Sequence, residues 1–331
     1  MDYSIETEGL RKTFILKRGW GFRRARQEVV AVDGIDLAVP SGQSVAFIGP
    51  NGAGKSTVIK ILTGILHPTA GRAQVLGFKP WVERRKLAYR IGTVFGQRSQ
   101  LWYHLPPRAT FELLARIYDL EESASRERRE LLIERFGLGP FLEIPVRKLS
   151  LGQRMRAEIA ASLLHSPKLL FLDEPTIGLD VIARQELRDL IQQWNRQEGL
   201  TVFLTSHDAG DIERVAERVI VINQGRLVLD DQVSTVRRQF LGSKVLAVKF
   251  HAPHRPVALP GVVTLEATEY SVKLEVETQV TPIEQVMNEV LKAGPVADLA
   301  IEDPPLEEII AQIYQRTAAA PADSREELSA R

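Results

Sequence analysis

The 331-residue chain contains no cysteine, which excludes a disulfide framework and any zinc or iron–sulfur site that depends on thiolates. Its six histidines are scattered and form no metal-binding motif. No apolar run approaches the roughly 18 residues that a spanning helix needs, and the first residues, MDYSIETEGLRK, are charged where an export signal would be apolar. We therefore expect neither a membrane-spanning helix nor an export signal. The length allows about two domains at roughly 150 residues each.

Charge is almost balanced over the chain, with 43 lysines and arginines against 42 aspartates and glutamates. Its distribution is uneven, however. Residues 1–239 hold 35 basic and 28 acidic side chains, a net charge of +7, whereas residues 240–331 hold 8 and 14, a net charge of −6. This change predicts a domain boundary near residue 240.

The stretch 17–26 holds five cations, no carboxylate and the aromatic residues Trp20 and Phe22. A solvated loop or short surface helix is the first interpretation. Contact with anionic lipid headgroups or an acidic partner is the alternative, because aromatic side chains favour interfaces. We expect no nucleic acid partner, since no nucleic-acid-binding motif accompanies the charge.

Short apolar runs alternate with amphipathic helical patterns along the first 239 residues. Residues 28–39 predict two strands around an Asp-Gly turn. Residues 108–165 are rich in Leu, Ala, Arg and Glu at helical spacing, and a helix is also expected at 181–197. The alternation predicts a parallel α/β sheet with an inserted helical region. Its strands are expected at the apolar runs 44–49, 91–96, 169–173 and 201–205.

A small α+β domain is expected at residues 240–316. Three segments between 244 and 277 alternate apolar and polar residues in the manner of half-buried strands. A helix at 282–293, a strand near 296–301 and a helix from Pro304 to about Arg316 follow. Residues 317–331 lack apolar periodicity, so we expect a disordered tail there.

A glycine-rich loop follows the apolar run 44–49 and precedes a helical pattern. Residues 49–56 fit G-x-x-x-x-G-K-S, whose glycines let backbone N–H groups converge on phosphate oxygens while the next helix presents its positive end. Lys55 is expected on the β- and γ-phosphates, Ser56 on Mg²⁺ and Thr57 on a phosphate farther back. A glycine-rich turn without function is the alternative. The predicted nucleotide-binding residues of the loop are Gly49, Pro50, Asn51, Gly52, Ala53, Gly54, Lys55, Ser56 and Thr57.

A second motif is the apolar strand that ends in Asp173 and Glu174. Beside a phosphate loop, Asp173 is suited to hold Mg²⁺ directly or through water, and Glu174 to polarise the attacking water. Two adjacent carboxylates would thereby separate nucleotide binding from hydrolysis. A solvated acidic turn after a core strand is the alternative.

Residues 150–154, SLGQR, resemble the signature loop of ATP-binding cassette (ABC) ATPases. The span from about 5 to 235 resembles a complete cassette, in the order phosphate loop, Gln97, signature, acidic strand, Gly178-Leu-Asp180 and Thr205-Ser-His207. The resemblance implies an α/β P-loop NTPase cassette at 1–239, with a mixed sheet core, an antiparallel β part and a helical subdomain at about 105–165.

The resemblance further implies that two cassettes, as a homodimer or a heterodimer, face each other head to tail with ATP between them. Ser150, Gly152 and Gln153 would bind the ATP held by the other cassette, near a helix N-terminus that favours phosphate. Asp180 would cross the interface to the facing phosphate loop. Leu151 stands where the usual signature has glycine; we interpret it as a tolerated variant, with a slower or partner-dependent ATPase as the alternative.

The same resemblance assigns the catalytic roles to Glu174, His207 and Gln97. Gln97 would reach both the metal, together with Ser56 and Asp173, and the water. His207 would bind the γ-phosphate and orient Glu174. Phe14 best matches the aromatic residue that stacks on adenine, and Trp20 and Phe22 are the alternatives.

The amino-acid sequences around Gln97 and Glu174 are similar to those of cassettes that pair with type 2 exporter permeases. A separate membrane permease is therefore the expected partner, with the chain cytoplasmic and held on the inner face of the cell membrane. Trp102 and Tyr103 are candidate docking residues for it, unless they pack inside the helical region. The alternative is a soluble cassette of translation or DNA repair, although repair ATPases insert long coiled coils and only 95 positions lead from Lys55 to Ser150. A plain nucleotide kinase would not account for the signature.

Overall fold

The structure is a computed structural model that describes residues 2–18, 25–96, 99–206, 208–239, 243–302, 309–310 and 313. It divides into two compact units after Asp231, earlier in the chain than the boundary expected from the charge distribution. The expected disordered tail and most of the expected helix at 304–316 lie outside the described residues, as do the side chains of the basic stretch 17–26.

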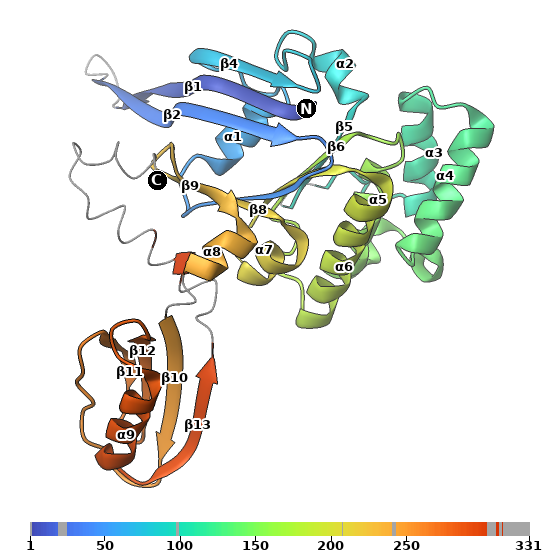
Figure 1. Ribbon diagram of the computed structural model, residues 1–331. Helices are drawn as coiled ribbons and strands as arrows, with labels where there is room; N and C mark the ends of the chain where they lie inside the picture. The colour runs from blue at the N-terminus through green and yellow to red at the C-terminus, as the bar shows by residue number, and fades with distance from the viewer. Residues whose placement is uncertain are drawn as a thin grey trace. The chain divides into compact units, whose positions relative to one another are not determined.

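A six-stranded sheet in the order β5-β6-β7-β3-β8-β9 forms the centre of the first unit (Figure 1). The five strands from β5 to β8 pair in parallel. Both faces of this sheet are covered: Leu169 and Phe171 of β6 join one buried cluster, and Leu170 joins the other. Double burial explains why these strands are continuous apolar runs in the sequence. The six strands are β3 (Ser44–Ile48), β5 (Ile91–Phe95), β6 (Leu169–Asp173), β7 (Thr201–Thr205), β8 (Arg218–Asn223) and β9 (Arg226–Gln232).

An antiparallel sheet in the order β2-β1-β4 covers one side of this unit. Its strands are β1 (Tyr3–Arg18), β2 (Ala25–Pro40) and β4 (Ala70–Val75). The expectation of two strands around an Asp-Gly turn was wrong, because β2 runs unbroken through both. Leu10 pairs with Ile35 and Arg11 with Asp33, so Gly34 is an extra residue with a φ of +73°. It forms a β-bulge, which needs the same positive φ that a turn needs.

Helices cover the remaining surfaces of the first unit, and the expected inserted helical region is present as α3 to α5. α1 lies between the two sheets, where its buried residues join a cluster with residues of β1 to β8. In Figure 1, α3 and α4 lie on the outer side of α5 and α6. Two 3₁₀ turns, Gly139–Phe141 and Val146–Lys148, lead into α5. The helices are α1 (Lys55–Leu62), α2 (Arg84–Ala88), α3 (Pro107–Ile117), α4 (Glu122–Arg135), α5 (Leu151–Ser162), α6 (Val181–Glu198) and α7 (Ala209–Val215).

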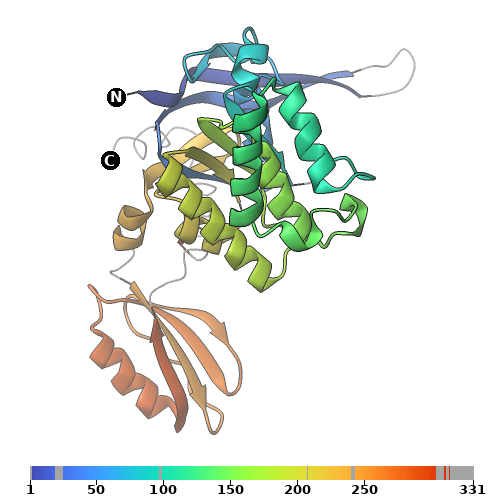
Figure 2. The ribbon, with the colours of Figure 1, turned by 90° about the vertical axis from the view of Figure 1, so that its right-hand side faces the viewer.

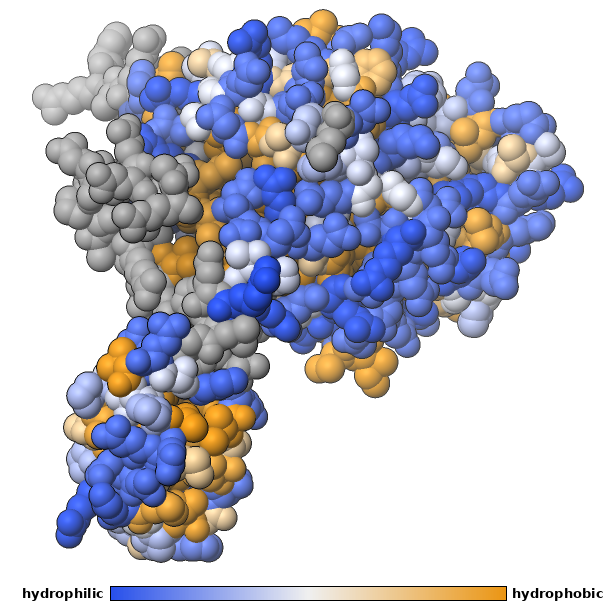
Figure 3. Space-filling model, viewed as in Figure 1, coloured by the Kyte–Doolittle hydropathy of each residue, from blue (hydrophilic) through white to orange (hydrophobic). Residues whose placement is uncertain are grey.

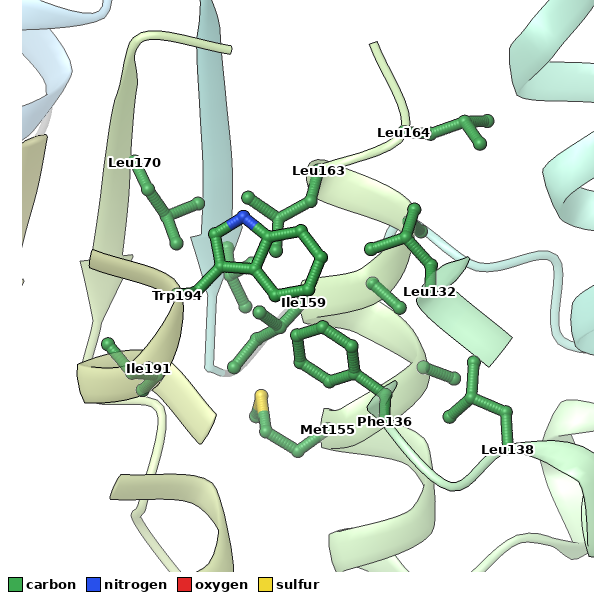
Figure 4. Close-up of a cluster of buried hydrophobic side chains, with 14 of the residues drawn as sticks. Leu132, Phe136, Leu138, Met155, Ile159, Leu163, Leu164, Leu170, Ile191 and Trp194 are labelled. Carbon is green, nitrogen blue, oxygen red and sulfur yellow. The ribbon is translucent and has the colours of Figure 1, made fainter. Parts of the chain in front are cut away.

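The helical region is joined to the sheet through a buried aromatic pair. Phe136, just after α4, and Trp194 of α6 have ring centroids 5.5 Å apart. Figure 4 shows Met155 and Ile159 of α5 and Leu170 of β6 around them. Because four elements share this cluster, the helix that begins after Ser150 is held to the strand that ends in Asp173.

The second unit is a four-stranded antiparallel sheet in the order β11-β12-β10-β13, with α9 on one face (Figure 2). Leu246, Leu274 and Val286 belong to its buried cluster. Figure 3 shows hydrophobic side chains gathered on part of its surface, and Leu291 and Ile301 are among those that remain exposed. None of the described helices is both long enough and apolar enough to cross a membrane. The elements are α8 (Val233–Gln239), β10 (Ser243–Phe250), β11 (Val262–Ala267), β12 (Ser271–Glu277), α9 (Ile283–Ala293) and β13 (Val296–Glu302).

Candidate nucleotide-binding site

The site is built at one edge of the parallel sheet. β3, β5, β6 and β7 run in the same direction, so their carboxyl ends share this edge, which is where α/β folds bind ligands. β3 leads into the loop at 49–54, and β6 ends at Asp173. Gly96, which follows β5, donates its N–H to the Asp173 carbonyl at 2.9 Å. The segment that would continue to Gln97 therefore starts beside the acidic strand.

The loop after β3 needs glycine at two of its positions. Gly54 has a φ of +111°, and a Cβ there would lie 2.4 Å from the carbonyl oxygen of Ala31 in β2. A Cβ on Gly49 would lie 2.3 Å from the carbonyl oxygen of Ile222 in β8. The loop backbone is thus pressed against two neighbouring strands, which leaves its other side for a ligand.

The first turn of α1 is suited to an anion. Gly54 is its N-cap and supplies no side-chain cap, so helix-terminal N–H groups remain for a ligand. Lys55 donates from Nζ to the carbonyl oxygens of Gly49 at 2.6 Å and Pro50 at 3.3 Å. Burial lowers the pKa of Lys55, while the charges of Glu174 and Asp173 act to raise it. A buried ammonium group beside free helix N–H groups fits phosphate oxygens.

The acidic pair is held by β7. Thr205 donates its hydroxyl to the Asp173 carboxylate at 2.6 Å, and its carbonyl and hydroxyl oxygens lie 3.1 and 3.2 Å from the Glu174 nitrogen. Glu174 has a φ of +54°, rare for a residue with a Cβ and typical of strained functional positions. The backbone thus leaves the extended strand conformation at Glu174, directly after Asp173.

The signature segment is the N-terminus of α5. Ser150 accepts a hydrogen bond from the Gln153 nitrogen at 3.2 Å and donates its own N–H to the Gln153 side chain at 3.0 Å, a capping box. Leu151 occupies the first helical position, and its side chain packs against the buried cluster that contains Phe136, Met155 and Trp194. Helical backbone does not require glycine there. A Cβ on Gly152 would lie 3.0 Å from the Cβ of Ala183 in α6, so this glycine allows α5 and α6 to approach.

The predicted site residues Asp180 and Phe14 lie outside the phosphate loop, the acidic strand end and the signature segment. Asp180 caps α6 by accepting the Ala183 N–H at 2.9 Å. Phe14 is half-buried in β1, with the Lys12 ammonium 5.2 Å from its ring centroid. Its partner in the sheet is Val29, two residues before the Ala31 that touches the loop. Gln97, His207, Trp20 and Phe22 lie outside the described residues, so their assigned roles stay predictions.

Three groups were missed by sequence reasoning: the Thr205 hydroxyl, the Asp211 carboxylate and the Arg188 guanidinium. Thr205 was noted within its motif but without its bond to Asp173. Asp211 is fully buried and bonded to Arg188. The available signal was spacing, since Arg184 and Arg188 are one helical turn apart and Asp208 and Asp211 are three residues apart.

The described residues contain no group of three or more His, Asp or Glu side chains that could hold a metal ion by themselves. Magnesium does not need one, because it usually binds through one or two carboxylates together with substrate phosphates. The exposed Ser56 on the first turn of α1 and the Asp173 carboxylate fit that pattern.

The sheet order, the phosphate loop and the acidic strand end define a P-loop ATPase cassette. Residues 32–177 match the family described as ABC transporter. The daunorubicin/doxorubicin resistance ATP-binding protein DrrA of Streptomyces peucetius is 36% identical over 248 residues, 75% of this chain and 71% of DrrA. The chain belongs to the family of ABC transporter ATP-binding proteins, and it is an ATPase of that family.

Two further comparisons agree. The lantibiotic transport ATP-binding protein SrtF of Streptococcus pyogenes is 36% identical over 217 residues, 66% of this chain and 88% of SrtF. The solved ATP-binding cassette MJ0796, in a dimeric post-hydrolysis state with ADP and Pi, superposes with a TM-score of 0.60 at 26% identity. That match covers 69% of this chain and 98% of the solved chain. The expected α/β P-loop cassette and its ATPase activity are therefore confirmed.

Proposed function

We propose that this ATPase powers an exporter by acting on a separate membrane permease. The similar proteins named for drug resistance and lantibiotic transport support an outward direction. In this proposal the chain works on the cytoplasmic face of the cell membrane, held there by the permease. Two cassettes, identical or different, close head to tail over two ATP molecules and reopen after hydrolysis.

The proposed site rests on one observation: the phosphate loop, Asp173 and Glu174 lie at the same edge of the parallel sheet, where β3 and β6 end. Lys55 and the free N–H groups of α1 would bind the β- and γ-phosphates. Glu174, whose charge acts on Lys55 together with that of Asp173, would accept the proton of the attacking water. Gln97 and His207 would position that water and the γ-phosphate.

Ser56, Asp173 and Gln97 are the proposed ligands of Mg²⁺. When bound, the ion neutralises charge that develops on the phosphate oxygens. The chain's own contribution is to fix the Asp173 carboxylate through Thr205 before the nucleotide arrives.

The signature segment is the proposed half-site for the second cassette. Ser150, Gly152 and Gln153 form the first turn of α5, whose N–H groups favour the γ-phosphate held by a facing copy. The capping box keeps this turn rigid. Asp180, at the start of α6, would meet the facing phosphate loop.

The proposed permease contact is the segment after Gln97. Trp102 and Tyr103 are 39% and 57% exposed, which favours docking over packing inside the helical region. Leu105 adds a third exposed apolar side chain. Such amphipathic aromatic side chains are typical anchors of protein interfaces.

We also propose domain boundaries, and roles for the second unit and for the basic stretch 17–26. We propose a nucleotide-binding domain at 1–239, which assigns α8 to it although the compact units divide after Asp231; the small domain is then 240–316 and a disordered tail 317–331. The exposed apolar side chains of the second unit support a role in steadying the dimer or binding a regulator. The basic stretch 17–26 is proposed to touch anionic lipid, with Phe14, Trp20 or Phe22 stacking on adenine.

Co-purification tests the proposed function most simply. The chain is expressed with each membrane protein of about six hydrophobic spans that the neighbouring genes encode, and ATP hydrolysis is measured with candidate export substrates. We expect a stable complex and substrate-stimulated hydrolysis. Trp102→Ala with Tyr103→Ala should dissociate the complex and leave basal hydrolysis intact. If the wild-type chain forms a complex with none of the co-expressed membrane proteins, the exporter assignment is contradicted.

A further inference from the structure

A buried polar network joins three segments around the site. Its centre is Asp211 in α7, whose side chain is fully buried. The carboxylate accepts the Thr176 hydroxyl at 2.5 Å, the Ser206 hydroxyl at 2.6 Å and Arg188 Nε at 2.6 Å. Thr176 and Ser206 are themselves buried, so their two bonds to Asp211 are shielded from water.

The partners of Asp211 come from the segments that carry the proposed chemistry. Thr176 lies two residues after Glu174, and Ser206 immediately precedes His207. Arg188 belongs to α6, the helix that Asp180 begins. The Asp211 carboxylate therefore connects three segments: the residues after Glu174, the residue before His207, and α6, which begins after Asp180.

Arg188 and Asp208 extend the network. Arg188 donates from Nη2 to the Asp208 carboxylate at 2.8 Å and from Nε to the Asp211 carboxylate. The guanidinium therefore bridges both carboxylates. Arg184 adds a 2.7 Å bond to Asp208. Burial acts to raise the pKa of Asp208, but Arg184 and Arg188 lower it overall. Asp208 also accepts the Gly210 N–H at 2.9 Å, which fixes the residues on the far side of position 207.

Space for the guanidinium depends on Gly210. A Cβ at this position would lie 2.7 Å from Arg188 Nη1. Because the end of an arginine side chain can move, Gly210→Ala would displace it from the carboxylates without removing any charge. Alanine is also favoured over glycine in a helix, so the substitution should not weaken α7.

We propose that Asp211 is a positioning residue for ATP hydrolysis, which holds the residues after Glu174 and before His207 in one fixed arrangement. The inference rests on the proposed roles of these two residues. It assigns Asp211 no contact with ATP, so nucleotide binding by the phosphate loop does not depend on it. The network acts on the hydrolysis step, where small displacements of a catalytic group cost large factors in rate.

The test compares ATP hydrolysis by Asp211→Asn, Gly210→Ala and Thr176→Val, at a temperature well below each variant's unfolding midpoint. We expect kcat to fall about tenfold or more with KM for ATP within about twofold, the split that marks a loss in the chemical step. Thr176→Val leaves the buried charges paired, and Gly210→Ala removes none of them, so these two variants cover the case in which Asp211→Asn does not fold. The matched control is Asp189→Asn, which removes the more exposed ion pair between Asp189 of α6 and Arg214 of α7.

Other outcomes would overturn the proposal. If Thr176→Val and Gly210→Ala keep wild-type kcat, or if kcat and ATP affinity fall together by the same factor, Asp211 has only a packing role. Combining Asp211→Asn with Thr176→Val should cost little more than Asp211→Asn alone, because both break the same network; additive losses contradict the proposal. Glu174→Gln is measured in parallel: if that variant hydrolyses ATP normally, the proposed site itself fails, and the positioning role with it.

Discussion

Thr205 donates its hydroxyl to the Asp173 carboxylate at 2.6 Å and is the last residue of the strand beside it. The same hydroxyl lies 3.2 Å from the Glu174 nitrogen. A single buried side chain thereby orients the carboxylate proposed for Mg²⁺ and the backbone of the residue proposed as base.

Thr205→Val should lower ATP hydrolysis about tenfold and raise the Mg²⁺ concentration needed for half-maximal rate. Valine keeps the shape but removes a bond to a charged group, worth about 1.5–3 kcal/mol. A magnesium titration of the steady-state rate measures this. Thr201→Val is the control, since Thr201 bonds to Ser4 and Gly42 at the opposite end of the same strand. Equal rates and magnesium dependence in both variants contradict the role of Thr205.

Lys55→Ala should abolish nucleotide binding. Lys55 is 7% exposed, is bonded only to loop carbonyls among the hydrogen bonds described, and lies near two carboxylates whose charge it offsets. Binding of a fluorescent ATP analogue provides the measurement. The exposed Lys60 of the same helix gives a matched control, Lys60→Ala. Unchanged ATP affinity in Lys55→Ala would remove the basis of the phosphate-loop assignment.

Acid should destabilise the first unit through His165. Burial lowers the pKa of His165 to about 4, an effect that the charge of Arg128 reinforces and the bond to the Ile91 carbonyl opposes. Its ordinary value is 6.5. Between these values the unfolded chain holds a proton that the folded protein does not, so stability is lost as the pH falls from 6.5 towards 4.

The variant His165→Phe isolates this contribution. Its ring can keep the stacked contact with Tyr118, whose centroid lies 4.0 Å away, but it cannot bind a proton. Urea unfolding at pH 7.5 and pH 5 should show a larger loss of stability for the wild type than for the variant. An identical loss in both proteins would mean that His165 is not responsible.

Phe136→Ala should destabilise the helical region by about 3–5 kcal/mol, the usual cost of removing a buried aromatic ring. Phe136 is 1% exposed and contacts Trp194 in the cluster of Figure 4. Ile117→Ala, at a position 54% exposed, should cost less than about 0.5 kcal/mol. Chemical denaturation followed by tryptophan fluorescence distinguishes the two. A similar small effect in both variants would show that the cluster does not tie the helices to the sheet.

The parts of the fold that depend on local pattern were predictable from sequence. The apolar run at β6 and the alternation of β12 specify strands because each side chain meets a buried or half-buried face. The loop before Lys55 was recognisable because backbone approach to phosphate requires glycine at fixed spacing.

Other features depend on contacts between distant segments. Gly34 was expected in a turn, and only pairing with β1 decides that its positive φ forms a bulge. The bonds of Asp211 join α7 to Thr176, Ser206 and Arg188, which are 5 to 35 residues away in the chain. The spacing of Arg184 with Arg188 and of Asp208 with Asp211 is a local signal, but it does not identify Thr176 and Ser206 as partners, because these polar residues are individually ordinary for helix and loop surfaces.

ATP-driven pairing of two cassettes is the central claim, and Glu174→Gln tests it most directly. Removing the proposed base should leave ATP bound and unhydrolysed, so that the closed dimer accumulates. Light scattering after gel filtration with ATP and Mg²⁺ should then give about twice the 37.1 kDa of one chain, and Ser150→Phe added to this variant should return it to a monomer. A Glu174→Gln protein that binds ATP and stays monomeric at all concentrations would contradict the account.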